Sequence, residues 1–300
     1  MLFEDYRRKI IEKNPALAGL DDVVEKELLH HDILAAMQGH GLLDDLCFVG
    51  GTALRLCHNS SRLSEDLDFA ADPAFKKEDL SDMAQILGKA IEGKYETQVY
   101  VRESQAKGDT SIWKITITKD AADPSLPSQK LHIDISAYPA LNAIKRPIVD
   151  HYGASPETSG TFIRCLSIQE SLADKMIALA FRERRVKPRD LWDIAWLVQQ
   201  DAKIDVQMIL EKLAMCAKRR EVFSKTLRKQ VLRLAEDETR DDFNAEMRRF
   251  VASTTAARTL DNPSFWPYLI EVVERQVDTF ESLILAGDLA DQGVSQPPRM

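Results

Sequence analysis

The sequence predicts an α+β fold, with a small mixed sheet flanked by helices in residues 1–165 and a helical bundle in residues 166–300. Before residue 166, short segments alternate apolar and polar residues, which is typical of strands with one buried face. After it, apolar residues recur every three or four positions, as in amphipathic helices. Because the two parts follow each other without a long linker, we expect the helical part to contribute to a ligand cleft beside the sheet.

The expected elements of the first part follow in order. Residues 22–38 have helical spacing and are followed by Gly39 and Gly41, which end the helix. The apolar run LCFVGG predicts a buried strand, and a helix is expected to begin after it with Thr52 as its N-cap. Further strands are predicted at DLDFA (66–70), ETQVYV (96–101), SIWKITIT (111–118), KLHIDIS (130–136) and TFIRC (161–165).

Composition indicates a globular protein without a membrane span. Hydrophobic residues make up 44% of the 300 residues, which is enough for a sizeable core. No apolar run approaches the roughly 20 residues needed to cross a bilayer. The four cysteines form no C-x-x-C pair, which favours reduced thiols over disulfides or a zinc site. We therefore expect a cytoplasmic protein.

The charge distribution leaves two interpretations open. The net charge is −8, yet AKRREVFSKTLRKQVLR (217–233) carries seven basic residues and one acid. A basic helix face can hold a nucleic-acid backbone by releasing counterions. More often, such a run is only a solvated helix surface.

The segment FVGGTALRLCHNSSRLSEDLDFA (48–70) contains the residues on which a function can be argued. Gly50, Gly51 and Thr52 follow a strand and precede a helix, so backbone N–H groups and the helix N-terminus can cradle a phosphate. A Gly-Gly pair after a strand is more often only a turn, so this feature is weak by itself.

Aspartates supply the second part of the pattern. Asp66 and Asp68 are two apart, so in a strand their carboxylates share one face. Two neighbouring carboxylates repel, and a cation such as Mg²⁺, which prefers oxygen ligands, relieves the repulsion. Exposed acids on an edge strand are the alternative. Asp134, between Ile133 and Ile135, favours the metal site, because an acid in an apolar strand is costly unless it is paired or ligating. His132 is expected to be a neighbour of this site and not a ligand.

These blocks resemble the nucleotidyltransferase superfamily of DNA polymerase beta and kanamycin nucleotidyltransferase, whose pattern is a Gly-Ser or Gly-Thr turn, D-x-D and a later strand acid. GGTALRL, RLSEDLDF, KLHIDIS, ESLADKMIALAFR and KPRDLWDI are more closely similar to the AbiEii/AbiGii toxin family of bacterial toxin–antitoxin systems. The similarity covers about half of the chain, and its specificity comes from five blocks in the right order. The spacer between the glycine turn and D-x-D is longer here than is typical of the superfamily.

The resemblance implies roles for individual residues. Asp66, Asp68 and Asp134 would be the catalytic carboxylates and would bind Mg²⁺. Gly50, Gly51 and Thr52 would hold the triphosphate of a nucleoside triphosphate. Lys175 would contact the same triphosphate, and Asp190 would be the acid of the late motif.

The sequence therefore predicts a Mg²⁺-dependent enzyme that transfers a nucleotide from a nucleoside triphosphate to an acceptor hydroxyl. The family link further implies an RNA acceptor, such as the 3′ end of tRNA, and a cognate antitoxin. Two alternatives remain: a catalytically silent nucleotide-binding protein regulated by an antitoxin, and a metal-dependent phosphohydrolase or nuclease. The absence of G-x-x-x-x-G-K-[ST], G-x-G-x-x-G, G-x-S-x-G and H-E-x-x-H argues against several other enzyme classes.

Overall fold

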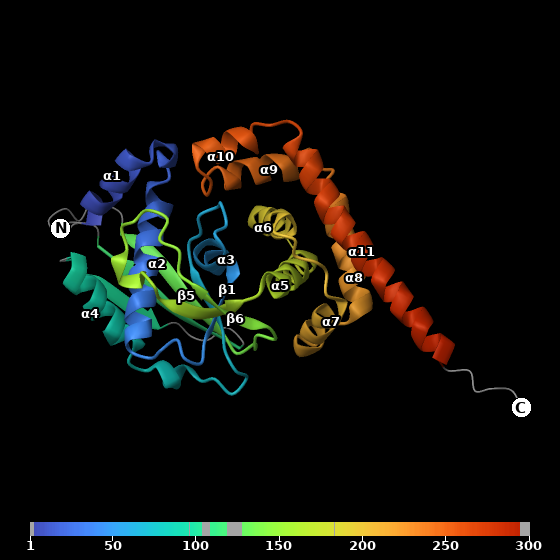
Figure 1. Cartoon of the computed structure of the whole chain (residues 1–300), viewed down its shortest axis with the longest axis horizontal. Coiled ribbons are helices and arrows are strands. Elements are labelled where there is room, and N and C mark those ends of the chain that lie inside the picture. Colours follow the sequence, from blue (N-terminus) through green and yellow to red (C-terminus); the bar gives the residue numbers. More distant parts are fainter. Residues whose placement is uncertain (1–2, 96, 104–108, 119–127, 183, 295–300) are drawn as a thin grey trace, which may run out of the picture. The chain divides into compact units, whose positions relative to one another are not determined.

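The computed structural model describes residues 3–95, 97–103, 109–118, 128–182 and 184–294. The chain forms two compact units (Figure 1). The first comprises Met1–Ser167 together with the later segment Arg248–Ala257, and the second comprises Ile168–Met247 and Arg258–Met300.

A seven-stranded mixed sheet forms the centre of the first unit, in the order β3-β4-β5-β2-β1-β7-β6. Two neighbouring pairs are parallel, β2 with β5 and β1 with β7, and the other pairs are antiparallel. The strands are β1 (Cys47–Val49), β2 (Leu67–Ala70), β3 (Val99–Glu103), β4 (Thr110–Ile117), β5 (Gln129–Ser136), β6 (Ala143–Pro147) and β7 (Phe162–Leu166). The sequence did not predict β6, a largely exposed edge strand that ends in a proline.

Helices α1 (Phe3–Lys13), α2 (Asp21–Gly39), α3 (Gly50–His58) and α4 (Met83–Tyr95) accompany the sheet, with short 3-10 turns at Pro15–Leu17, Lys77–Leu80 and Pro156–Thr158. Helix α2 lies across the sheet (Figure 1) and is buried along most of its length. It therefore buries charged side chains, which need partners. Glu27 accepts two hydrogen bonds from Arg55 of α3, at 3.0 and 3.1 Å, and Asp32 pairs with Lys94 of α4.

Alternation along the strands separates the core from a half-exposed face. Phe48 of β1 and Phe69 of β2 stack in the core with their ring centroids 5.2 Å apart. Ile133 and Ile135 of β5 are also fully buried, whereas the residues between and beside them are half-exposed. Side chains alternate between the two faces of a strand, so the polar residues of β2 and β5 lie on the face opposite this core.

The second unit is helical, as expected. Its helices are α5 (Ile168–Ala180), α6 (Pro188–Gln199), α7 (Val206–Met215), α8 (Arg220–Arg233), α9 (Asp237–Met247) and α11 (Phe265–Val294), and α10 (Ser253–Arg258) spans the division between the units. Lys212 of α7 is buried and contacts Glu170 at 2.8 Å and Asp174 at 2.7 Å, which ties α7 to α5. Within the described part of the chain, no helix has the length and apolarity required to span a membrane.

Candidate active site

Asp68 and Asp134 lie next to each other in the sheet. They are partners in the parallel pairing of β2 with β5, and both are half-exposed between buried apolar neighbours. Since paired residues of parallel strands point to the same face, the two carboxylates leave the sheet on the same side. The topology thus brings together two acids that are far apart in the sequence.

Asp66 precedes β2 by one residue and is held from two directions. Its Oδ1 accepts a hydrogen bond of 3.1 Å from the backbone N–H of His132, whose Nδ1 is 3.4 Å from the same oxygen. Its carbonyl oxygen accepts a hydrogen bond of 2.5 Å from the hydroxyl of Thr52. The carboxylate of Asp66 is therefore positioned toward β5, the strand that carries Asp134.

The role predicted for Thr52 as a helix N-cap is wrong. Helix α3 begins at Gly50, with Val49 in the N-cap position, and Thr52 is its third residue. Thr52 is completely buried, and its hydroxyl is engaged with the carbonyl of Asp66 instead of a helix N–H group. This bond fastens the start of α3 to the residue that carries the first acid.

Both glycines of the turn leave space for functional side chains. Gly50 has a left-handed backbone, φ 76°, and a Cβ at this position would overlap Oδ2 of Asp68. A Cβ at Gly51 would overlap Nη2 of Arg62 and come within 2.9 Å of Oγ of Ser64. The Asp68 carboxylate thus lies at the N-terminus of α3, where the helix dipole favours negative charge.

Arg62 is a residue of this site that the sequence interpretation missed. It is only 2% exposed, and its Nη1 donates to the carbonyl of Leu63 at 3.0 Å. The returning segment 248–257 holds this part of the chain, because the N–H of Leu63 donates to the carbonyl of Phe250 at 2.8 Å and Arg62 forms a β-bridge with Val251. In the sequence, Arg62 is recognisable only as an arginine shortly before D-x-D, and an arginine at such a position is usually exposed.

The electrostatics of Asp134 suit a cation ligand. Burial, and next the nearby charge of Asp66, raise the pKa of the Asp134 carboxyl above its ordinary value. Its Oδ1 is buried and accepts no hydrogen bond from any residue that the structure describes. A buried carboxylate oxygen without a partner is unfavourable, and a bound cation would satisfy it.

The carboxylates of Asp66, Asp68 and Asp134 do not form a compact metal-binding cluster in this structure. Among the described residues, no group of three or more His, Cys, Asp or Glu side chains converges as a metal site. Asp68 faces the start of α3, and Asp66 faces the backbone of β5. Like charges separate in the absence of a cation, so this arrangement is compatible with a metal-binding set whose side chains turn inward when an ion is bound.

His30 of α2 holds the segment that leads into β2. Its Nε2 lies 3.0 Å from the carbonyl oxygen of Glu65, so in the neutral ring this nitrogen donates the hydrogen bond. Burial lowers the pKa of His30 to about 4, which keeps the ring neutral. The side chain of Glu65 pairs with Lys26 at 3.1 Å. The residue preceding Asp66 is thereby anchored to α2.

The predicted residues of the helical unit form a cluster of their own. Lys175 of α5 lies 3.2 Å from Asp190 and 2.8 Å from Asp193, both on α6. Arg182 adds a second contact to Asp190, at 3.0 Å. Arg189, which follows the proline at the start of α6, contacts Glu246 at 3.2 Å.

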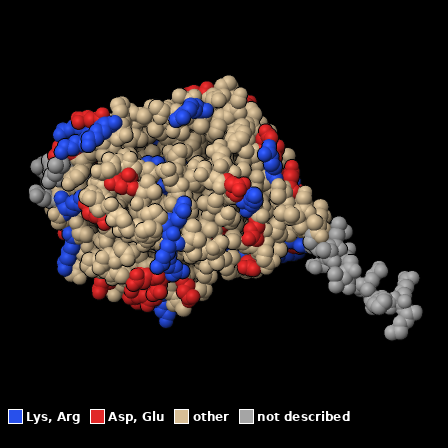
Figure 2. Space-filling model, in the orientation of Figure 1, with Lys and Arg blue, Asp and Glu red and all other residues tan. Residues whose placement is uncertain are grey.

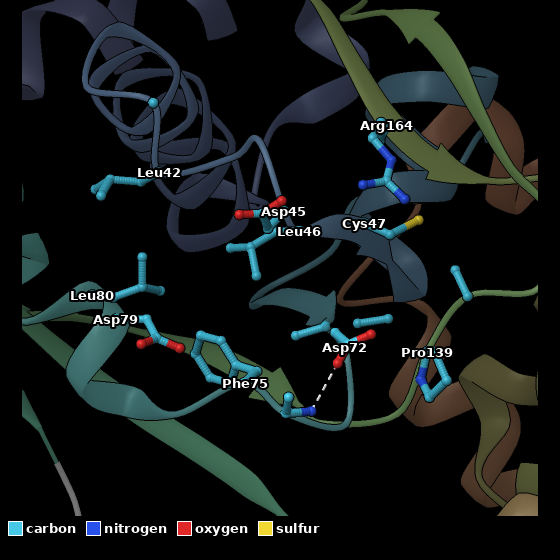
Figure 3. Close-up of a pocket in the computed structure, with 15 residues that line it drawn as sticks. Leu42, Asp45, Leu46, Cys47, Asp72, Phe75, Asp79, Leu80, Pro139 and Arg164 are labelled. Atoms are coloured by element: carbon cyan, nitrogen blue, oxygen red, sulfur yellow. Dashed lines mark hydrogen bonds between the residues drawn. The ribbon is translucent and has the colours of Figure 1, made fainter.

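A cavity of 640 Å³ in the first unit is drawn in Figure 3, and its lining does not include Asp66, Asp68 or Asp134. Leu46 and Cys47 line it at the beginning of β1, and Ala70 lines it at the end of β2, so it opens at the opposite end of these two strands. Asp72 at its rim accepts a hydrogen bond of 2.8 Å from the N–H of Ala74. None of the predicted site residues lines this cavity.

The fold is that of a nucleotidyltransferase. MenT4, a nucleotidyltransferase toxin from Mycobacterium tuberculosis H37Rv, superposes with a TM-score of 0.51 at 18% identity, covering 77% of this chain and 72% of that one. JHP933 from Helicobacter pylori superposes with a TM-score of 0.50 at 14% identity, covering 90% of this chain and 97% of that one. No curated protein sequence matches the chain.

The family described as nucleotidyl transferase AbiEii toxin, type IV toxin–antitoxin system, matches residues 32–271, and the chain belongs to this family. It is therefore a nucleotidyltransferase and the toxin component of such a system, which implies a nucleotide substrate and an antitoxin partner. The resemblance, the fold class and the enzyme class predicted from the sequence are confirmed. The metal, the acceptor and the roles of individual residues remain predictions.

Proposed function

We propose that the protein uses Mg²⁺ to transfer a nucleotide from a nucleoside triphosphate to a hydroxyl of an RNA acceptor, such as the 3′ end of tRNA. The observation that carries the proposal is the in-register pair of Asp68 and Asp134, with Asp66 held against the strand of Asp134. Three carboxylates beside the N-terminus of a helix are suited to holding a cation and a triphosphate together. The predicted cytoplasmic location belongs to this proposal, since both substrates occur there.

In this proposal, Asp66, Asp68 and Asp134 hold the metal. A divalent ion bound there supplies charge that activates the attacking oxygen and stabilises the leaving pyrophosphate. Asp134 also accepts the proton of the acceptor hydroxyl. The position of Asp134 directly beside Asp68 supports this role, because a general base must lie within reach of the hydroxyl that it deprotonates.

The start of α3 binds the triphosphate. The first N–H groups of a helix have no partners within the helix and carry its positive dipole end. Gly50, Gly51 and Thr52 contribute these groups, while the Thr52 hydroxyl stays with the carbonyl of Asp66. In the helical unit, the Lys175 ammonium group has the charge to contact a phosphate, and Asp190 keeps this group oriented, as their contact of 3.2 Å supports.

Transfer of a labelled nucleotide tests the proposal. The purified protein is incubated with total RNA, each nucleoside triphosphate and Mg²⁺, and both RNA label and released pyrophosphate are measured. We expect incorporation that EDTA abolishes and that falls at least a hundredfold in Asp134→Asn. Asp44→Asn, at an exposed position of the same unit, is the matched control and should retain full activity.

Other products would identify a different function. Inorganic phosphate or shortened RNA in place of pyrophosphate and extended RNA would indicate the hydrolase or nuclease alternative. Nucleotide binding without incorporation into any RNA would favour the silent binding protein. Incorporation that is equal in Asp134→Asn and in the wild type would overturn the assignment of the carboxylates.

A further inference from the structure

A second cavity, of 350 Å³, lies within the helical unit. It is bordered by the end of α5 and the residues that follow it, by Lys218, and by α8. The charged residues that line it, among those that the structure describes, are all cationic: Arg182, Lys218, Lys229 and Arg233. Such a cavity selects an anionic ligand.

The structure places six of the seven basic residues of the run 217–233 in two groups. Arg228 turns to α11 and pairs with Asp278 at 2.8 Å and with Glu281. Arg219 and Arg220 contact Glu221 at 3.5 and 3.7 Å. These three cations are compensated by acids, whereas other cations of the same run line the cavity.

Three of the four cationic groups of the cavity are held in place by neighbouring groups. Nη2 of Arg233 donates to the carbonyl of Arg184 at 3.2 Å, and Arg182 is bound by Asp190. The ammonium group of Lys218 lies 5.0 Å from the ring centroid of Phe181, a cation–π contact. Groups that are already ordered lose less entropy when they bind a ligand, so the cavity is prepared for binding.

Backbone geometry also directs Lys218. Ala217 has a left-handed backbone, φ 51°, and ends α7 in a Schellman turn in which the N–H of Lys218 donates to the carbonyl of Leu213 at 2.8 Å. Glycine is the usual residue at such a position, because a Cβ is unfavourable there. The turn fixes where the Lys218 side chain leaves the backbone.

We propose that this cavity binds the phosphate backbone of the RNA acceptor. The inference rests on the proposed function, since it assumes that the acceptor is a nucleic acid. With a net charge of −8, the whole protein repels a polyanion, and Figure 2 shows Lys and Arg side chains interspersed with Asp and Glu on one face. Arg182 is paired with Asp190, so Lys218, Lys229 and Arg233 supply the local positive charge that overcomes this repulsion.

Binding of RNA without transfer tests the inference. The probe is a labelled single-stranded oligoribonucleotide, measured by fluorescence anisotropy in EDTA and without nucleotide. The variant is Lys218→Ala/Lys229→Ala, because both lysines are exposed and their removal leaves the helix core intact. Lys203→Ala, at a position of the same unit that is 79% exposed and outside the cavity, is the control.

The expected change follows from counterion release. Each phosphate contact to a single strand contributes about 0.7 to the slope of log affinity against log salt, so loss of two contacts lowers the slope by about 1.4. The affinity gap between variant and control should therefore narrow by about sevenfold between roughly 50 and 200 mM salt. Poly-glutamate serves as a second probe of similar charge.

Each result supports or overturns the inference. Weaker RNA binding with the reduced salt slope supports it, even if the wild type transfers no nucleotide, in which case only the proposed function fails. Equal RNA affinity and slope in the variant and the control overturn it, even if transfer to RNA is observed. Poly-glutamate that binds more tightly than RNA and loses affinity in the same variant would overturn it in favour of an acidic protein partner.

Discussion

Replacement of Gly50 by alanine tests whether the glycine turn exists to accommodate the Asp68 carboxylate. A Cβ at Gly50 would overlap Oδ2 of Asp68 and lie 3.1 Å from its Cγ, in addition to occupying a backbone with φ 76°. Gly160 offers a matched control in the same unit. Its φ is 75°, and a Cβ there would meet no atom within 4 Å.

Gly50→Ala and Gly160→Ala place alanine in the same left-handed backbone conformation, but only Gly50→Ala creates a steric overlap. A left-handed backbone costs a residue with a Cβ about 1–2 kcal/mol, so Gly160→Ala should lose about that much stability. In Gly50→Ala, the Asp68 side chain must also leave its rotamer, which adds about 0.5–1.5 kcal/mol. For a domain of this size, each kcal/mol corresponds to about 2–4 °C in Tm.

Thermal unfolding and nucleotide transfer are measured on both variants. Displacement of a reacting group by about 1 Å can cost about a hundredfold in rate, so Gly50→Ala should lose about that factor in kcat/KM while Gly160→Ala retains activity. In an Asp68→Ala background, the extra destabilisation by Gly50→Ala should largely disappear. Equal Tm and equal kcat/KM for Gly50→Ala and Gly160→Ala would refute the reasoning.

Three further substitutions test the supporting structure. Acidification from pH 6.5 to 4 should lower the free energy of unfolding by about 2.6 kcal/mol through His30 alone, because the unfolded chain takes up a proton with an ordinary histidine pKa of 6.5 while burial lowers the pKa of His30 to about 4. His30→Gln should remove this part of the pH dependence. Glu27→Gln should cost about 3–5 kcal/mol in denaturant unfolding, since it leaves the Arg55 guanidinium without its buried anion. Ala217→Gly should raise stability by about 0.5–1 kcal/mol, because relief of the left-handed backbone exceeds the added entropy of the unfolded chain.

Matched substitutions separate these effects from general ones. His40→Gln, at an exposed histidine, is the matched control, and a pH profile of His30→Gln identical to that of the wild type would contradict the role of His30. A loss below about 1 kcal/mol in Glu27→Gln would show that the pair contributes little. Ala214→Gly, inside α7, should destabilise by about 1 kcal/mol, and a decrease of Tm in Ala217→Gly as well would contradict the proposed relief.

Local sequence patterns were sufficient for most elements of the first unit. The alternation in KLHIDIS predicted β5 and the half-exposed face on which Asp134 lies, because a strand with one buried face has a period of two. The alternation did not extend to β6, where the first two residues are half-buried and the last three are exposed. The N-cap propensity of threonine was misleading at Thr52. A threonine before a helix usually caps it, whereas the Thr52 hydroxyl donates a hydrogen bond to the carbonyl of Asp66.

The sequence by itself determined which residues can carry the chemistry: the acids, the glycine turn and the lysine are recognisable from residue type and spacing. Only the tertiary structure decided which of them meet. Strand order places β5 beside β2, so that Asp134 becomes the neighbour of Asp68. The returning segment holds the chain beside Arg62, and this buries the guanidinium against Gly51. The spacing of residues within one segment predicts the face of a helix or strand on which a side chain lies. Contacts between distant segments depend instead on how the whole chain buries its apolar surface.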